Sequence, residues 1–129
     1  MVSAASNDMS RALPFHRLLG VTQIDAANGE ALVRLGQGTD IRNSKGEVHG
    51  GAISALFDIV MSRAVRSANV DAWGLATVSM TVNYLEPGHG SLVARARLVR
   101  NGRTLAVANS TIEREDGQLV AQATAYSAS

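Results

Sequence analysis

The stretch HGGAISALFDIVMSRAVRSA, residues 49–68, decides the fold class, because it contains the best helix candidate in the chain. Ala, Leu, Ile, Met, Arg and Ser dominate positions 50–68, which predicts a helix about 28 Å long at 1.5 Å per residue. Its apolar side chains lie nearly all the way round the axis: Ile53, Leu56, Phe57, Ile59, Val60, Met61 and Val65. A helix with this pattern is buried on most of its sides.

The sequence that follows this helix alternates with a period of two, which is typical of strands. Residues 76–83, ATVSMTVN, carry apolar side chains at even and polar side chains at odd positions. This predicts a half-buried strand with Thr77 on its polar side. Three further strands are predicted over 91–99, 104–114 and 118–127. The dipeptides Asn101-Gly102 and Asp116-Gly117 predict hairpin turns between them.

The sequence before the helix adds shorter elements. Residues 9–19 predict a short helix with Pro14 near its start. Residues 20–35 predict two strands around the turn dipeptide Asn28-Gly29, and residues 36–48 a loop. The expected fold is therefore α+β, with one long helix and an antiparallel sheet of five or six strands. We expect one domain over residues 1–129, in which residues 1–8 form a flexible tail.

Composition excludes several functional classes. The chain has 129 residues, of which 46% are hydrophobic, 18% charged and 4% aromatic, and its formal net charge is +1. This balance does not favour nucleic-acid binding. The chain has no cysteine, which excludes disulfides and a thiol nucleophile. Because no apolar run approaches a membrane span and the N-terminus does not resemble a signal peptide, we expect a cytoplasmic protein.

Asp58 is an unusual residue for such an apolar helix. With Ser54 and Ser62 it forms a narrow polar stripe at positions i, i+4 and i+8. An unpartnered carboxylate in an apolar interior costs several kcal/mol. Three ordinary explanations stay open: an ion pair with Arg63 or Arg66, an exposed helix face, or a structural hydrogen-bond acceptor. The fourth explanation is a reactive carboxylate in a cleft.

His49, Gly50 and Gly51 form the entry to the helix. The first N–H groups of a helix lack internal partners, and a glycine there lets a ligand approach the backbone. A carbonyl oxygen docked on the Gly50 N–H would be polarised, as in an oxyanion hole, although the glycines alone also fit a flexible helix entry. Gly50 and Asp58 lie about 12 Å apart along one helix. If both act on one substrate, we expect Asp58 to come from a partner subunit.

These residues together resemble a known family. Asn43-Ser-Lys-Gly-Glu-Val-His49-Gly50-Gly51, followed by Asp58 in an apolar helix, is similar to the motif of hotdog-fold acyl-CoA thioesterases. The similarity is greatest to the phenylacetate-degradation (PaaI-like) branch, related to the 4-hydroxybenzoyl-CoA thioesterases. It extends over roughly residues 12–127. The family implies a central helix wrapped by an antiparallel sheet, a homodimer as the minimal active unit, and often a homotetramer.

The resemblance also implies a role for each motif residue. The Gly50 N–H would polarise the thioester carbonyl, with Gly51 beside it at the substrate. Asp58 of the partner subunit would be the nucleophile or the general base, and Asn43 would orient the attacked group or the water. His49 would hold the carbonyl or the loop. Thr77 stands where family members place a small hydroxyl residue near the carboxylate.

Coenzyme A enters these expectations as part of the substrate, and no separate cofactor is expected. Arg97, Arg100 and Arg103, with Arg95, surround the Asn101-Gly102 turn and could bind the phosphates of coenzyme A. An ordinary charged strand edge is an equally good explanation. No metal is expected, because His16 and His89 show no ligand spacing with His49.

The expected function is hydrolysis of an aryl- or medium-chain acyl-CoA thioester. Two alternatives stay open. The first is a hotdog enoyl-acyl hydratase or dehydratase, although the position of Asp58 nine residues after His49 favours the thioesterase. The second is a non-catalytic acyl-CoA binding protein on the same fold. The acyl group and the choice between nucleophile and general base also stay open.

Overall fold

The structure is a computed structural model that describes residues 7–38, 40–68 and 75–128, and structural statements refer to these ranges. Its elements are η1 (Met9–Arg11), α1 (Pro14–Leu19), β1 (Val21–Ala27), β2 (Glu30–Leu35), α2 (Gly50–Ala68), β3 (Ala76–Tyr84), β4 (Leu92–Asn101), β5 (Leu105–Arg114) and β6 (Leu119–Ala128). The long helix begins and ends at the predicted residues, and all predicted strands are present. Within these ranges no helix is long and apolar enough to cross a membrane.

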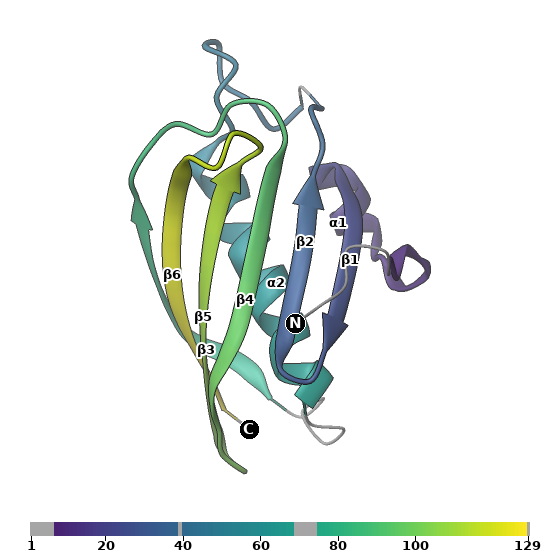
Figure 1. Cartoon of the computed structure of the whole chain (residues 1–129), viewed down its shortest axis with the longest axis vertical. Helices are drawn as coiled ribbons and strands as arrows, with labels where there is room; N and C mark the ends of the chain where they lie inside the picture. Colours follow the sequence, from purple (N-terminus) through teal and green to yellow (C-terminus); the bar gives the residue numbers. More distant parts are fainter. Residues whose placement is uncertain (1–6, 39, 69–74, 129) are drawn as a thin grey trace.

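One antiparallel sheet contains all six strands, in the order β1-β2-β4-β5-β6-β3. Figure 1 shows α2 lying across one face of this sheet, and α2 packs chiefly against β2, β4 and β5. The prediction of a long helix wrapped by an antiparallel sheet is therefore confirmed, and the architecture is a hotdog fold. In this arrangement β1 and β3 form the two edges of the sheet.

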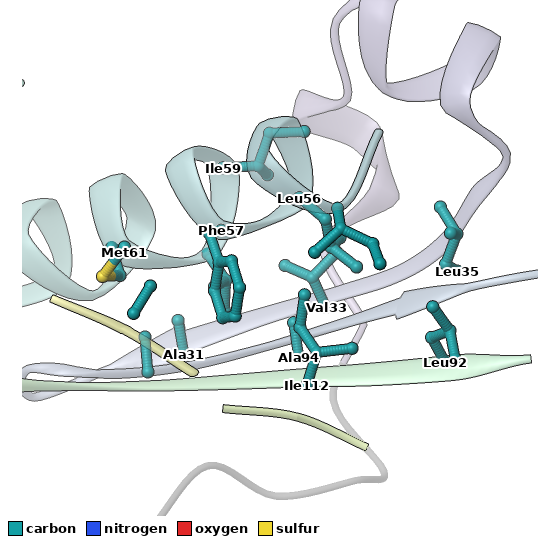
Figure 2. Close-up of a cluster of buried hydrophobic side chains, with 14 of the residues drawn as sticks. Ala31, Val33, Leu35, Leu56, Phe57, Ile59, Met61, Leu92, Ala94 and Ile112 are labelled. Carbon is teal, nitrogen blue, oxygen red and sulfur yellow. The ribbon is translucent and has the colours of Figure 1, made fainter. Parts of the chain in front are cut away.

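The hydrophobic core lies between α2 and the concave side of the sheet. Leu56 and Phe57 of α2 are completely buried, and Figure 2 shows them pointing toward Val33, Ala94 and Ile112 of the strands. Burying one such large apolar side chain stabilises the fold by about 1.5–3 kcal/mol. The core therefore fixes the rotation of α2 about its axis, and this rotation decides where the polar stripe points.

The N-terminal region differs from the prediction of one short helix over 9–19. It forms η1 and α1, separated at Ala12 and Leu13. Pro14 disfavours the helical conformation at the residue before it, and Leu13 is extended with φ −82° and ψ 161°. Residues 1–6 of the expected tail lie outside the described residues, whereas the Asp8 N–H donates to the Ile24 carbonyl of β1 at 2.6 Å.

The two Asn-Gly turns require glycine for different reasons. Asn28 and Gly29 both have positive φ, 54° and 85°, as the predicted β1–β2 hairpin turn requires. The β4–β5 hairpin is also present, but a positive φ is not what requires Gly102. A Cβ atom there would lie 2.5 Å from the Leu105 carbonyl oxygen. Gly102 is therefore needed for a close backbone approach.

Strand β3 differs most from its prediction. It was expected to be half-buried with Thr77 on the polar side, but Val78 is 63% exposed and only Met80 and Val82 pack against the core. The register with β6 shifts between Thr77 and Ser79, which is the signature of a β-bulge. Because of this shift, Thr77 lies opposite the buried Ser127. The bulge thus turns Thr77 toward the helix side of the sheet, and the prediction for its face is wrong.

Candidate active site

Arg42 holds the loop that leads into α2. Its guanidinium group donates hydrogen bonds of 2.7–3.5 Å to the carbonyl oxygens of Gly36, Gly38, Gly46, Gly88 and Gly90. The Val48 N–H also donates to the Gly88 carbonyl at 2.9 Å. These bonds join the loop before α2 to the loop after β3. Sequence reasoning missed Arg42, because its partners are backbone carbonyls that no side-chain pattern reveals.

Asn43 shapes the turn just before the helix. Its Oδ1 accepts the N–H groups of Lys45 at 2.9 Å and Glu47 at 3.1 Å. Its Nδ2 donates to Oε1 of Glu47 at 3.0 Å. An asparagine amide has two N–H donors, so one remains for a substrate or a water molecule. In the single chain, Asn43 is chiefly a turn residue.

His49 caps the N-terminus of α2. Its Nδ1 accepts the Gly51 N–H at 2.9 Å, and its carbonyl oxygen accepts the N–H groups of Ala52 and Ile53. Within the described ranges, the Gly50 N–H donates to no protein acceptor. The helix entry is therefore ordered by hydrogen bonds, and its one uncommitted N–H belongs to the glycine expected to polarise a carbonyl.

Tyr84, at the end of β3, lies over the same turn. Its hydroxyl group donates to the Gly50 carbonyl oxygen at 3.0 Å and bonds Ser54 Oγ at 2.5 Å. Sequence reasoning placed Ser54 on the polar stripe but did not assign Tyr84 to the site. Its position at the end of a strand carries no sign of this contact, which spans more than thirty residues of chain.

Asp58 lies on the exposed side of α2 that faces β3. Its Oδ1 accepts a hydrogen bond from Thr77 Oγ1 at 2.8 Å. Of the ordinary explanations for this residue, the exposed helix face and the hydrogen-bond acceptor both hold in the single chain. Leu56 and Phe57 point into the core instead of enclosing the carboxylate. The bulge in β3 is what brings the Thr77 hydroxyl to Asp58.

A cleft of about 320 Å³ opens beside this carboxylate. It is lined by Asp58, Ser62, Val65, Arg66, Leu75, Ala76, Thr77 and Ser127. The cleft continues along α2 toward its C-terminal end, away from Gly50. The lining combines hydroxyl groups and a guanidinium group with three aliphatic side chains, which allows an organic ligand with both apolar and polar parts.

None of the three arginines predicted to bind coenzyme A lines this cleft. Arg97 lines a shallow groove on the sheet face turned away from α2, and it lies opposite Glu30 and Asn109 in the ladders. The sheet thus separates Arg97 from Asp58 in the single chain. Arg100 lies at the end of β4, and Arg103 lies in the β4–β5 turn. Among the residues described, no three His, Asp or Glu side chains form a metal-binding group.

Comparison with known proteins places the chain in a sequence family. Residues 45–121 match the thioesterase superfamily. A protein of Halobacterium salinarum named "Putative esterase" is 38% identical over 99 residues, which cover 73% of this chain and 66% of that protein. The chain therefore spans just under two thirds of the length of this relative.

Two solved structures show the same fold with higher coverage. A mutant of the phenylacetic acid degradation protein PaaI from Thermus thermophilus superimposes with a TM-score of 0.79 and 28% identity, covering 90% of this chain and 98% of that one. A Streptococcus mutans protein bound to acetyl-CoA gives a TM-score of 0.81 and 27% identity, covering 95% of each chain. The similarity includes the described helix and sheet together.

Proposed function

The chain belongs to the thioesterase superfamily, and we propose that it is a thioester hydrolase whose substrates are acyl-coenzyme A esters. The observation that carries this proposal is the uncommitted N–H of Gly50 at the start of α2, on the same stripe as Asp58. The Gly50 N–H can bind a developing oxyanion, and the Asp58 carboxylate can attack the carbonyl carbon or activate a water molecule. The acetyl-CoA bound to the streptococcal neighbour supports coenzyme A as the carrier.

A homodimer would complete this site. Strand β3 is a sheet edge whose side chains are largely exposed, which suits pairing with β3 of a second copy. Gly50 and Asp58 lie four residues on either side of Ser54. A two-fold axis near Ser54 would therefore place Gly50 of one protomer opposite Asp58 of the partner subunit. The same dimer would explain why Gly50 and Asp58 of one chain lie two helical turns apart.

The proposed reaction is addition of oxygen to the thioester carbonyl, followed by loss of the thiolate. The carbonyl oxygen binds the Gly50 N–H, which stabilises the negative charge that develops on it. Asp58 of the partner subunit either removes a proton from the water that attacks the carbonyl carbon, or attacks that carbon itself and forms an anhydride, which water then hydrolyses to release the acid and restore the carboxylate. The C–O bond forms, the C–S bond breaks, and the coenzyme A thiolate leaves and takes up a proton. The Thr77 hydroxyl orients the carboxylate through its 2.8 Å bond.

The remaining residues have supporting roles in the proposal. His49 holds the helix entry through Gly51, and Asn43 holds the preceding turn with one amide N–H directed to substrate or water. Arg100, near the end of β4, and Arg103, in the β4–β5 turn, stay candidate phosphate ligands. Arg97 would require a ligand, or a neighbouring protomer, on the other face of the sheet.

The identity of the acyl group is a finer part of the proposal. The name of the Thermus neighbour, a phenylacetic acid degradation protein, favours an aryl group, with a medium-chain acyl group as the competitor. The relation to 4-hydroxybenzoyl-CoA thioesterases, the homotetramer and the cytoplasmic location stay predictions. So do the single domain and the absence of a separate cofactor.

Thiol release from a panel of aryl- and alkyl-CoA esters tests the proposal. Wild type and Asp58→Asn are compared, because the amide keeps the size of the side chain but is neither a nucleophile nor a base. We expect wild type to hydrolyse at least one ester class and Asp58→Asn to lose most turnover while staying folded and dimeric. Equal rates would remove Asp58 from the reaction. Tight ester binding without turnover in wild type would instead identify a binding protein.

A further inference from the structure

The first turn of α2 is held from two sides. On one side, His49 Nδ1 accepts the Gly51 N–H at 2.9 Å. On the other side, the Tyr84 hydroxyl donates to the Gly50 carbonyl oxygen at 3.0 Å. The Gly51 N–H and the Gly50 carbonyl belong to the same peptide group, so this peptide is fixed at both of its polar ends.

Ser54 completes the contact. Tyr84 has one hydroxyl proton, which it gives to the Gly50 carbonyl, so the Ser54 hydroxyl donates its own proton to Tyr84 across 2.5 Å. Ser54 lies one helical turn after Gly50, and Tyr84 comes from the end of β3. These two hydrogen bonds in series, from Ser54 to Tyr84 and from Tyr84 to Gly50, thus connect the start of the helix to the edge strand.

Two adjacent glycines need such a constraint. Glycine has the greatest backbone freedom of any residue, so Gly50-Gly51 would otherwise sample many orientations of its peptide groups. A hydrogen-bond donor stabilises a transition state only if its direction is set before the reaction. His49 fixes the peptide group before Gly50 through its carbonyl oxygen, and Tyr84 fixes the peptide group after it.

We propose that Tyr84, supported by Ser54, is a positioning residue: by holding the peptide group after Gly50 it restrains the backbone of that glycine, and so keeps the Gly50 N–H in place for the thioester carbonyl. This inference rests on the proposed function, because it gives Gly50 the role of oxyanion donor. Tyr84 also shapes the approach to that donor. A Cβ atom on Gly50 would lie 3.5 Å from Cε1 of Tyr84, so the ring forms the wall beside the glycine.

The test compares Tyr84→Phe with Tyr126→Phe. Tyr84→Phe keeps the ring beside Gly50 and removes only the hydroxyl group. Tyr126, the other tyrosine, is 42% exposed on β6 and lies opposite Ser79 and Val107, so Tyr126→Phe is the matched control. Ser54→Ala removes the hydrogen bond from Ser54 to Tyr84 and keeps the bond from Tyr84 to Gly50.

We expect Tyr84→Phe to lower kcat about tenfold or more, because a displaced oxyanion donor loses its effect steeply with geometry. KM should rise by no more than about fivefold, in line with a weaker contact to the substrate carbonyl, and the melting temperature should change little. Ser54→Ala should have a smaller effect in the same direction. Tyr126→Phe should match wild type. Amide hydrogen exchange at Gly51 and Ala52 should become faster in Tyr84→Phe only, which reports the loosened turn directly.

Binding of two non-hydrolysable analogues tests the same point without turnover. One replaces the thioester sulfur of an acyl-CoA by CH₂ and keeps the carbonyl; the other is a thioether of coenzyme A that lacks the carbonyl. Tyr84→Phe should weaken the ketone about fivefold relative to the thioether, the effect of losing one modest hydrogen bond. A merely structural tyrosine would weaken both analogues equally or neither.

The outcomes separate this inference from the proposed function. If Asp58→Asn is inactive but Tyr84→Phe keeps wild-type kcat and analogue preference, the positioning role is wrong and the thioesterase stands. If wild type hydrolyses no ester, the proposed function fails, and the analogue ratio still decides whether Tyr84 directs the Gly50 N–H. A fall in kcat that only follows a loss of folded protein also overturns the inference.

Discussion

Gly50 and Gly51 are chemically identical, but the structure gives their N–H groups different tasks. The Gly51 N–H is engaged by His49, whereas the Gly50 N–H is uncommitted in the described chain. The space around them also differs. A Cβ atom on Gly50 would meet Tyr84 at 3.5 Å, an ordinary contact, whereas one on Gly51 would lie only 3.2 Å from His49 Nδ1.

Gly50→Ala should therefore fold normally and lose activity. Alanine is favoured over glycine in a helix by up to about 1 kcal/mol, so the melting temperature should not fall. Its methyl group would obstruct the approach to the N–H group, and we expect turnover to fall about 100-fold. Thermal unfolding and thiol release measure the two effects. Wild-type turnover in the folded variant would exclude Gly50 as the oxyanion donor.

The Thr77 hydroxyl group donates a hydrogen bond of 2.8 Å to the Asp58 carboxylate. Thr77→Ser keeps this donor, and Thr77→Val replaces it with a methyl group of similar shape. We expect Thr77→Val to reduce kcat about tenfold or more, because the carboxylate loses its orientation. Thr77→Ser should retain most activity. Similar rates for both variants would show that the hydroxyl does not act on the reaction.

At the scale of elements, α1 depends on a buried histidine. His16 is only 5% exposed, and its Nδ1 accepts the Leu13 N–H at 3.1 Å. Burial lowers the pKa of His16 below its ordinary value of 6.5, and the positive charges of Arg63 and Arg17 lower it further. Folding therefore favours the neutral imidazole, which is also the form able to accept the bond from Leu13.

This histidine should make stability depend on pH. Below pH 6.5 the unfolded chain binds a proton that the folded chain resists, so the free energy of unfolding should fall as the solution is acidified through this value. Above it, the contribution of His16 should be constant. Urea unfolding of wild type and His16→Gln between about pH 5 and 8 measures the difference, in which other titrating groups cancel. An identical pH dependence in the variant would contradict the assignment.

The loop before α2 depends on Arg42 in a similar way. A lysine keeps the positive charge but cannot spread its donors over two loops as the planar guanidinium does. We expect Arg42→Lys to lower the free energy of unfolding by about 1–3 kcal/mol. Arg17→Lys is the control, because Arg17 is exposed and its hydrogen bond to the Ala12 carbonyl is long, 3.4 Å. If Arg42→Lys were as stable as wild type, the loop would not need the guanidinium group.

At the scale of the whole molecule, the proposed active dimer depends on the exposed edge strand β3, where a second protomer would pair. Val78 on β3 is 63% exposed, so the fold of one chain depends little on it. In a dimer paired through β3, Val78→Asp would bring a charge into the interface. We expect a folded monomer without turnover, checked by sedimentation and thiol release.

Val99→Asp is the matched control for the edge strand. Val99 is 55% exposed and lies at the far end of β4, away from the free edge of β3. This variant should remain dimeric and active. If Val78→Asp also stays dimeric and active, the dimer does not form through β3, and Gly50 and Asp58 must meet in another way.

Local sequence patterns are sufficient to predict the elements and the residues of the helix stripe. The limits of α2, the strands and the Asn28-Gly29 turn follow from periodicity and local backbone preference, which act between near neighbours. The uncommitted Gly50 N–H could also be predicted, since the first N–H groups of any helix lack internal partners. The resemblance to thioesterases placed Thr77 near Asp58, and the structure brings these two side chains together.

The packing of the elements against one another brings distant groups together around this stripe. The bulge at Val78 turns Thr77 toward α2, although the alternation of its strand predicts the opposite face. Tyr84 reaches Gly50, and Arg42 reaches Gly88, across long stretches of chain. Such contacts depend on strand register and on how the helix rotates over its core. Both are set by packing among all the elements, which no local pattern in the sequence encodes.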